Sequence, residues 1–553
     1  MFLHSEKLRG SAIKYVLTAM AVFFLSGAIC TWIEARRRFM DPDSFYHLKM
    51  ALLMRDHGIV RSFPWLPLTT LAKDYTDHHF LYHLLLIPFI TAFGPYTGMI
   101  VATIFFAACT ITLFYVLLTT YGARHAWAYT FILMTASSFI FRLNLAKASA
   151  LSLLVLFCAL IAIKKNNSLA LFVISWLYVL LYGGWPIMIV VVGTFLAAHI
   201  VVDHFFDRHP LHSWARFFFW NRLFRGSRNA WTDFFSAPET RHAVAVVAGL
   251  GCGVVVNPYF PANIHFYWNQ IVQIALIGYK DTIGVGSEWY PSSLDTLFLT
   301  TSGIFLLAMV AMTVSAFILF WPETLRHERD AIQRHELTAM IAGAFLTALF
   351  FVMTLRSKRH VEYFAPFAVF AFALLTDFVI RRVDIRAVFA KVSFFSGRLR
   401  TIPVAATVMV FVFLVIGAKD VVATHTLYAN GVPWTRYAGA TTWIAAHAPK
   451  DAIIFHSSWD EFPPLFFHDD GRRYIIGLDP TFLYLRDSVR YQLWVDVTTG
   501  NVPRGAAALV KREFGARYVF IAHDNEEMLH AFESDPGAAP VYKDKDAEIF
   551  ALL

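Results

Sequence analysis

The sequence predicts a polytopic α-helical membrane protein that ends in a small α/β domain. The chain has 553 residues, of which 57% are hydrophobic and only 16% are charged. Its mean hydropathy of +0.53 is too high for an ordinary soluble protein of this size. About eleven apolar stretches could be transmembrane helices, and after residue 418 the composition becomes that of a soluble domain. The expected domains are therefore a transmembrane domain, 1–418, and a soluble domain, 419–553.

The apolar stretches are the first element of this prediction. A run of about 17–25 apolar residues can cross a bilayer, and a slightly shorter run can span if its helix extends into the flanks. The first run lacks a small-residue cleavage site and is expected to be an uncleaved anchor. The stretches lie near 13–33, 97–119, 126–141, 149–163, 168–183, 185–203, 241–256, 296–320, 338–354, 361–380 and 401–418.

A further apolar stretch, Phe80–Phe93, is expected to lie on the membrane surface. It has about 14 residues with Pro88 inside, which suits an interfacial or re-entrant helix better than a span. If it does not cross, the basic loops 208–228, 326–334 and 381–400 lie on the same side as the basic N-terminus. The positive-inside rule makes that side cytoplasmic. The sequence therefore predicts a multi-pass protein of the bacterial inner membrane with a cytoplasmic N-terminus.

The periplasmic face then receives the large first loop 34–96, the loop 257–295 and the whole C-terminal domain. In that domain Ala452–Phe455 and Tyr518–Ala522 are expected to be buried strands. Alternating strands and helices predict a periplasmic α/β domain. The helices between the strands are expected at Thr441–His447, Ala506–Phe514 and Glu526–Phe532.

Two carboxylates follow the first span directly, in the segment Met40-Asp41-Pro42-Asp43-Ser44-Phe45-Tyr46-His47. Carboxylates at a membrane surface are costly to desolvate, so they usually hold a metal, a proton or a cationic partner. Their position before a polytopic body indicates an enzyme that handles a phosphate-bearing lipid through a divalent cation, Mn²⁺ or Mg²⁺. Asp41 and Asp43 would be its ligands. The alternative is a helix cap, because Asp-Pro starts helices well.

The end of the first loop carries two acids and two histidines, in Asp74-Tyr75-Thr76-Asp77-His78-His79. Asp77, His78 and His79 are candidates for the same site, with Asp77 as a further metal ligand. A zinc site would be harder to build here, because adjacent histidines point in different directions on a regular element. The alternative is a polar edge to the surface helix that follows.

A glycine-containing outer loop, 281–291, offers a candidate for catalysis. Gly284 and Gly286 give it the freedom to order over a substrate. Glu288 stands beside two aromatic residues and could be a metal ligand, a base or an acceptor-binding group. The alternative is a surface loop anchored by Trp289.

Cations on the outer side, against the positive-inside trend, are candidates for binding an anionic lipid phosphate. One group is Arg356, Arg359 and His360, and Arg142 and Lys147 form a second in the turn 142–148. The alternative is ordinary snorkelling at the membrane interface.

The first strand of the soluble domain is followed by His456-Ser457-Ser458-Trp459-Asp460-Glu461. Polar and acidic residues at the end of such a strand are a common place for a binding site. Trp459 and Asp460 are therefore candidate substrate-binding residues, and a structural loop is the alternative.

These segments, in this order, resemble the catalytic subunit of oligosaccharyltransferase and its single-subunit relatives, which are type C membrane glycosyltransferases. The segment beginning at Asp41 resembles the family's metal-binding first-loop motif, and Ser-Glu-Trp-Tyr-Pro around Glu288 resembles its catalytic outer loop. Arg356 or Arg359 resembles the arginine of a late span, and Ser458-Trp459-Asp460 resembles the acceptor-recognition segment. Two features depart from the family: the turn 142–148 carries no acid, and the acceptor segment has one Trp and no Tyr-Gly.

The resemblance implies an inverting glycosyltransferase that moves a sugar or glycan from a polyprenyl-(di)phosphate donor to a periplasmic acceptor. The acceptor could be protein, lipid or polysaccharide, membrane lipid is a further expected partner, and nucleic acid is not expected as a partner. Two alternatives stay open. One is a transferase that uses a polyprenyl-monophosphate sugar and modifies a lipid or polysaccharide. The other is a transporter of a lipid-linked glycan, although the chain lacks the internal repeats that transporters often show.

Overall fold

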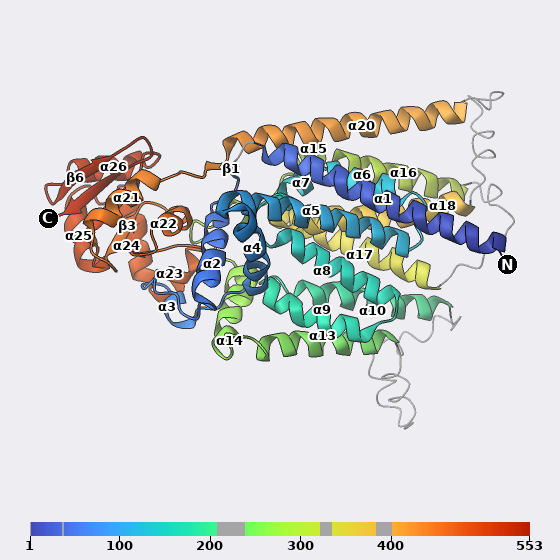
Figure 1. Ribbon diagram of the computed structural model, residues 1–553, viewed down its shortest axis with the longest axis horizontal. Helices are drawn as coiled ribbons and strands as arrows, with labels where there is room; N and C mark the ends of the chain where they lie inside the picture. Colours follow the sequence, from blue (N-terminus) through green and yellow to red (C-terminus); the bar gives the residue numbers. More distant parts are fainter. Residues whose placement is uncertain (1, 36–37, 207–237, 321–333, 383–400) are drawn as a thin grey trace, which may run out of the picture.

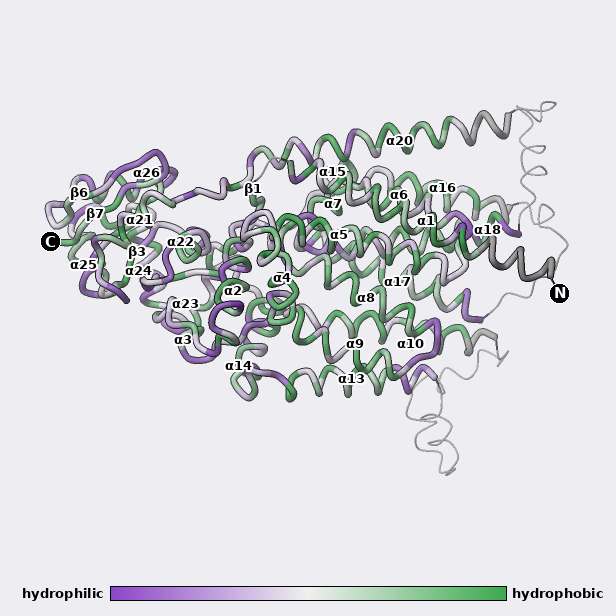
Figure 2. The backbone as a smooth tube through the Cα atoms, viewed as in Figure 1, coloured by the Kyte–Doolittle hydropathy of each residue, from purple (hydrophilic) through white to green (hydrophobic). Residues whose placement is uncertain are grey.

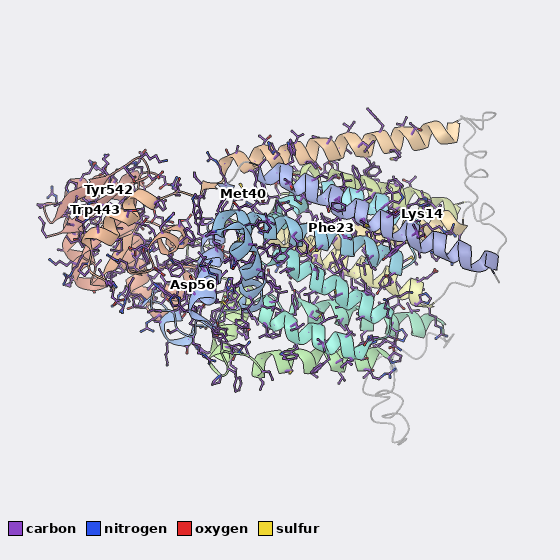
Figure 3. All side chains as sticks on the ribbon, in the orientation of Figure 1. Lys14, Phe23, Met40, Asp56, Trp443 and Tyr542 are labelled. Carbon is purple, nitrogen blue, oxygen red and sulfur yellow. The ribbon has the colours of Figure 1, made fainter. Side chains whose placement is uncertain are left out.

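The computed structural model describes residues 2–35, 38–206, 238–320, 334–382 and 401–553. It shows a long bundle of helices with a mixed domain attached to one end (Figure 1). The bundle is largely hydrophobic along its length, whereas the domain alternates between polar and apolar segments (Figure 2). Lys14 lies toward the far end of the bundle, and Met40 lies where the bundle meets the domain (Figure 3).

Every predicted apolar stretch is helical, which confirms a helical membrane protein. In the described part of the chain, five helices are long and apolar enough to cross a membrane, or seven if each of two bent pairs counts as one span. A total of about eleven spans stays a prediction. The bundle consists of α1 (Phe2–Glu34), α5 (Pro95–Thr120), α6 (Ala126–Thr135), α7 (Ser137–Leu143), α8 (Ser149–Lys164), α9 (Ser168–Leu181), α10 (Ile187–Phe206), α13 (Pro238–Val255), α15 (Leu294–Thr300), α16 (Ser302–Phe320), α17 (Arg334–Arg356), α18 (Val361–Arg382) and α20 (Thr401–Leu427).

One of the bent pairs places functional side chains. Helices α6 and α7 meet at an angle of 80°. The cause is Ala136, whose extended backbone (φ −68°, ψ 117°) interrupts the helical hydrogen bonding. The bend leads α7 and the following turn, which holds Lys147, to the end of the bundle near the C-terminal domain.

The long loop after α1 forms a helical layer between the bundle and the domain (Figure 1). It contains α2 (Asp43–His57), α3 (Leu71–Asp74) and α4 (Phe80–Phe93). With 14 residues, α4 is shorter than a typical span. A short antiparallel pair joins β1 (Arg38–Phe39) to β2 (Val432–Pro433) and so ties the beginning of this loop to the domain.

The C-terminal domain has the predicted α/β architecture. Its five-stranded sheet has the order β4-β3-β5-β7-β6, in which β3 is parallel to β4 and β5, and β7 is antiparallel to its neighbours. The two predicted strands are confirmed as β3 (Ile453–His456) and β5 (Tyr518–Ala522), and the predicted helices as α21 (Ala438–His447), α25 (Ala506–Phe514) and α26 (Glu526–Glu533). Sequence reasoning missed β4 (Arg473–Tyr474), β6 (Ala538–Lys543), β7 (Ala547–Leu552), α22 (Phe462–His468), α23 (Thr481–Arg486) and α24 (Ser488–Thr498).

The loops on which the predicted orientation depends lie largely outside the described residues. These are 208–228, 326–334 and 381–400. The described helices support a membrane protein, and its orientation and its bacterial inner-membrane location stay predictions.

Candidate active site

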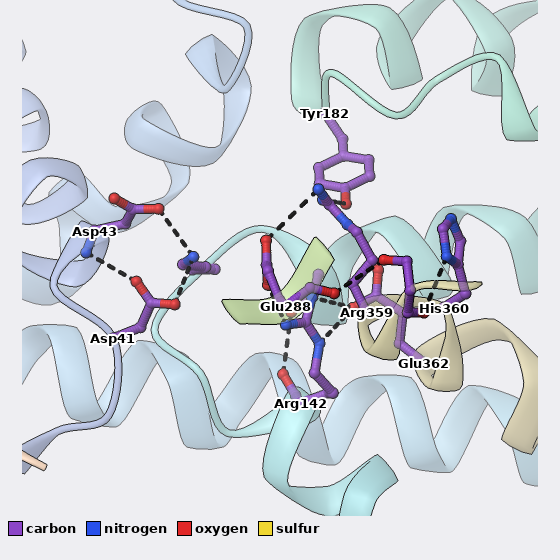
Figure 4. Close-up of polar contacts among 11 residues, drawn as sticks. Asp41, Asp43, Arg142, Tyr182, Glu288, Arg359, His360 and Glu362 are labelled. Atoms are coloured by element: carbon purple, nitrogen blue, oxygen red, sulfur yellow. Dashed lines mark hydrogen bonds and ion pairs between the residues drawn. The ribbon is translucent and has the colours of Figure 1, made fainter. Parts of the chain in front are cut away.

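Asp41 and Asp43, the acid pair after the first span, both form ion pairs with Lys147. The Lys147 Nζ lies 2.6 Å from Asp41 Oδ2 and 2.9 Å from Asp43 Oδ2. Figure 4 shows Asp41 and Asp43 side by side. Lys147 comes from the turn between α7 and α8, so the contact joins the bundle to the start of α2. Two sets of residues that the sequence marked separately, the acids and the outer-side cations, therefore form one cluster.

The beginning of α2 explains the shape of this cluster. The Asp43 N–H donates a hydrogen bond to Asp41 Oδ1 at 2.9 Å, which forms an Asx-turn directly before α2. Asp43 is the first residue of α2, whose N-cap is Pro42 without a side-chain cap, and both acids face Lys147. Burial raises the pKa of Asp43 to about 6, against the opposing effect of Lys147. Burial acts to lower the pKa of Lys147, but the two carboxylates outweigh it, so the pKa is raised and the amine stays charged.

A second cluster surrounds Glu288. Arg142 Nη1 lies 2.5 Å from Glu288 Oε2, and Arg359 Nη1 lies 3.5 Å from Glu288 Oε1. Arg142 also donates to Glu362 Oε2 from Nε at 3.0 Å and from Nη2 at 2.8 Å. Arg359 donates to the Tyr182 hydroxyl at 3.3 Å. Segments far apart in the sequence therefore converge in this cluster (Figure 4).

The arginines decide the protonation of Glu288. Burial raises the pKa of a carboxylate, but the guanidiniums of Arg359 and Arg142 outweigh that effect and hold the pKa of Glu288 well below its ordinary range. Glu288 is therefore ionised at neutral pH. Such a group orients cations or an acceptor well, but it is a poor proton acceptor near neutral pH.

The loop that carries Glu288 is held on both sides. The Ser357 hydroxyl donates to the Glu288 carbonyl oxygen at 2.9 Å, and the Lys358 N–H donates to the Tyr290 carbonyl oxygen at 3.0 Å. Further along the loop, Ile283 is only 4% exposed and belongs to the hydrophobic core of the C-terminal domain. The loop thus connects the turn between α17 and α18 to that domain.

Aromatic side chains cover this loop. The guanidinium of Arg359 lies 4.4 Å from the centre of the Trp289 ring, in a cation–π geometry. The edge of the Trp459 ring lies 3.5 Å from the point where a Cβ on Gly286 would be. A Cβ there would make only an ordinary van der Waals contact, so this approach does not depend on glycine. Trp459 is placed against the loop of Glu288, and its substrate-binding role stays a prediction.

Asp77, His83 and His47 form a chain of buried, hydrogen-bonded side chains between α4 and α2. His83 Nδ1 is 2.7 Å from Asp77 Oδ2, and His83 Nε2 is 2.8 Å from His47 Nδ1. Asp77 also accepts a hydrogen bond from the His79 N–H at 3.0 Å, in the turn directly before α4. His78 packs against Phe266, with ring centres 5.1 Å apart. This network fixes α4 against α2, which carries Asp43.

The four acids predicted as metal ligands already have other partners. Asp41 and Asp43 contact an ammonium, Glu288 contacts two guanidiniums and Asp77 contacts His83. Among the described residues, no group of three or more His, Cys, Asp or Glu side chains lies close enough to hold a metal ion. The residues as arranged do not fit a divalent metal, and bound Mn²⁺ or Mg²⁺ stays a prediction for experiment.

The remaining predicted residues differ in their placement. Arg356 ends α17 with an exposed side chain, and it is Arg359 that reaches Glu288. His360 stays beside this cluster, with Nδ1 3.2 Å from the Ser357 carbonyl oxygen. Asp460 is exposed and lines a separate polar groove of about 790 Å³ between the first loop and the domain. The groove also involves Arg38, Arg436, Glu461 and Asp524.

Sequence reasoning missed Glu362, Tyr182, His47 and His83. Glu362 is 1% exposed at the beginning of an apolar helix, and an acid in that position is a signal that could have been used. Tyr182 precedes the Gly-Gly-Trp-Pro turn, and His47 lies one helical turn after Asp43. His83 lies inside an apolar run, where a polar residue needs a partner.

Comparison with known proteins identifies the class of fold. No family model and no curated protein sequence matches the chain. Solved structures do match, and they define the fold as that of the type C membrane glycosyltransferases.

Three of these solved structures represent the match. The archaeal oligosaccharyltransferase AglB from Archaeoglobus fulgidus, in complex with an inhibitory peptide and a dolichol-phosphate, has a TM-score of 0.59 at 12% identity, over 97% of this chain and 74% of its own. ArnT from Cupriavidus metallidurans, bound to undecaprenyl phosphate, has a TM-score of 0.54 at 16% identity, over 98% of both chains. The mycobacterial arabinofuranosyltransferase AftD has a TM-score of 0.57 at 14% identity, over 97% of this chain and 40% of its own. At these identities the likeness establishes the fold.

Proposed function

We propose that this protein is an integral-membrane glycosyltransferase that transfers a sugar or glycan from a polyprenyl-phosphate donor to an acceptor on the outer face. The observation that carries the proposal is the convergence of Asp41, Lys147, Glu288, Arg142 and Arg359 where the bundle meets the C-terminal domain. The shared fold adds support, because two of its members were solved with dolichol-phosphate and undecaprenyl phosphate. A charged cluster at the membrane surface suits a substrate whose phosphate is anionic and whose chain is apolar.

The proposed reaction breaks the bond between the anomeric carbon of the sugar and the phosphate oxygen. A new bond forms between that carbon and a nucleophilic atom of the acceptor, and the polyprenyl phosphate leaves with the electron pair. The acceptor proton goes to a carboxylate of the acid pair. Asp43 suits this step because burial raises its pKa to about 6, closer to neutrality than that of Glu288. Arg142 and Arg359 would stabilise the departing phosphate, which is usually a large part of such catalysis.

Two versions of this function are possible, and they differ in the donor lipid and in the acceptor. In the oligosaccharyltransferase-like version, a glycan on a diphosphate is transferred to a protein side chain near Trp459. In the other version, a single sugar on a monophosphate is transferred to lipid or polysaccharide. Lys147 on the acid pair, in a turn without an acid, favours the second version, because a diphosphate leaving group carries more charge and depends more on a metal.

A transfer assay tests the proposal. Purified protein in lipid receives polyprenyl-linked sugars and a periplasmic extract, with Mn²⁺ or EDTA, and the products are read by mass spectrometry. We expect wild-type protein to move sugar onto an acceptor and folded Asp41→Ala protein to be inactive. Full activity of Asp41→Ala would contradict the site. Movement of labelled lipid across the membrane without cleavage of the glycosidic bond would establish a transporter instead.

A further inference from the structure

We propose that Lys147 is a built-in cation that takes the position of a divalent metal between Asp41 and Asp43, so that the site works without metal. The first part of this proposal, that Lys147 excludes a metal from the acid pair, does not depend on which reaction the protein catalyses. The second part, that Lys147 contacts the donor phosphate, rests on the proposed function. The proposal concerns a specific exchange of one cation for another within the same acid pair.

The geometry of the contact supports this exchange. Lys147 Nζ lies within 2.6 Å and 2.9 Å of one oxygen from each carboxylate. A metal bridging the same two oxygens would have to occupy nearly the same point, since its own bonds to oxygen are about 2.0–2.6 Å long. Ammonium and metal therefore cannot be present together at this point.

The side chain of Lys147 is also well fixed. It is 16% exposed, and the side chains of Asp41 and Asp43 are 22% and 31% exposed. The turn that carries it is short, between the end of α7 at Leu143 and the start of α8 at Ser149. A snorkelling lysine would instead extend its amine toward water or lipid headgroups. Here the amine points inward to the acid pair.

The two arginines of the site contact other residues, so Lys147 is the cation that bridges Asp41 and Asp43. Arg142 is shared between Glu288 and Glu362, and Arg359 contacts Glu288 and Tyr182. An ammonium has three N–H groups. Ion pairs with Asp41 and Asp43 account for two of them, and in the proposed complex the third would donate to a phosphate oxygen. Lys147 would therefore join the acid pair to the donor as a metal does.

Manganese binding tests the exchange directly, without any assay of turnover. Full-length protein in detergent is titrated with Mn²⁺, and free ion is read by electron paramagnetic resonance. Wild-type protein should bind no Mn²⁺ at this site, so Asp41→Asn should leave its titration unchanged. Lys147→Glu, which supplies a third carboxylate, should bind one Mn²⁺ per chain, and the double variant with Asp41→Asn should lose it.

A matched control comes from the same helix as Asp43. Lys49 pairs with Asp470 at 3.2 Å, on the domain side of α2, so Lys49→Glu alters a lysine–aspartate pair outside the site. It should gain no Mn²⁺. The proposal would be overturned if wild-type protein bound one Mn²⁺ per chain and Asp41→Asn abolished that binding. This outcome can be observed even if no variant of Lys147 folds. Folded Lys147→Glu protein without Mn²⁺ would overturn the proposal as well.

Measurements of sugar transfer test the proposal in a second, separate way. Wild-type transfer should be unaffected by EDTA, and Lys147→Met should lower kcat by about 100-fold or more while Lys49→Met stays near wild type. Loss of wild-type activity in EDTA would overturn the proposal. If wild-type protein transfers no sugar under any condition, the proposed function fails, whereas the manganese titration still decides what occupies the acid pair.

Discussion

Glu288 meets two arginines at once, and this changes the chemistry expected of it. As part of a glycine-containing loop it could have been a metal ligand or a base. Its contacts with Arg142 at 2.5 Å and Arg359 at 3.5 Å keep it ionised. Its charge is then useful for holding the two guanidiniums in place for a phosphate, or for orienting an acceptor. A residue in that role contributes through its charge more than through proton transfer.

Neutralising Glu288 should therefore reduce transfer strongly. Glu288→Gln keeps the shape of the side chain but removes the charge, so Arg142 and Arg359 lose their shared partner. We expect a decrease of about 100-fold in kcat/KM, measured by the transfer of labelled sugar. The position of the acidic limb of the pH–rate profile should stay unchanged, because Glu288 is not the titrating group.

A comparable pair at the other end of the bundle serves as the control. Glu336 contacts Arg381 at 3.1 Å and Arg382 at 3.6 Å, so Glu336→Gln also removes a carboxylate shared by two arginines. It should leave kcat/KM near wild type. A folded Glu288→Gln protein with more than half of wild-type activity would contradict the role assigned to Glu288.

At the scale of elements, the α2–α4 contact depends on histidines that are neutral. Burial lowers the pKa of His47 and His79 well below the ordinary value, and it lowers the pKa of His78 to about 4. In the unfolded chain these side chains would titrate near pH 6.5. Below that pH the unfolded state binds more protons than the folded state does, so folding becomes less favourable. Asp43 acts in the opposite direction, because its raised pKa favours protonation of the folded state.

These histidines should therefore lower thermal stability as the pH decreases from 6.5 toward 4, and each contributes on the order of 1–3 kcal/mol. Burial raises the pKa of Asp43, Glu461, Asp469 and Asp479, and these carboxyl groups act in the opposite direction, so the test compares variants with wild type. The melting temperature in detergent, followed by tryptophan fluorescence, measures this. Between pH 7.5 and 4.5 His47→Gln should lose less stability than wild type, whereas His447→Gln, at an exposed position of α21, should follow wild type. A pH dependence of His47→Gln that is parallel to that of wild type would contradict the argument.

The same scale shows what local sequence can predict. Apolar length is a local property, so the stretches near 97–119 and 361–380 became α5 and α18 with boundaries within a few residues. Strand β4 was missed because it has only two residues and depends on pairing with β3, and β6 was missed because it is exposed or half-buried throughout and contains Pro540, although it pairs with the adjacent β7. The residue types allowed individual site residues to be predicted, but the partners of those residues could not be predicted. Arg142 and Glu288 are separated by 146 positions, and a single sequence does not encode which cation meets which acid.

At the scale of the whole molecule, the fold places the acid pair and the C-terminal domain at the same end of the bundle (Figure 1). The short β1–β2 pair connects that domain to the first loop. A donor lipid in the membrane and an acceptor at the domain could then meet at the cluster around Lys147. This geometry requires that the domain and the donor phosphate face the same compartment.

The predicted orientation can be tested at two exposed lysines on opposite ends of the bundle. Lys450 lies in the C-terminal domain, and Lys165 follows α8 at the end away from Lys147. In spheroplasts, a membrane-impermeant maleimide should label Lys450→Cys and should reach Lys165→Cys only after the membrane is opened. The unmodified chain is the control, because its four cysteines are buried or half-buried. Labelling of Lys165→Cys in intact spheroplasts, with Lys450→Cys protected, would place the domain in the cytoplasm. The donor would then have to present its phosphate at the inner surface of the membrane.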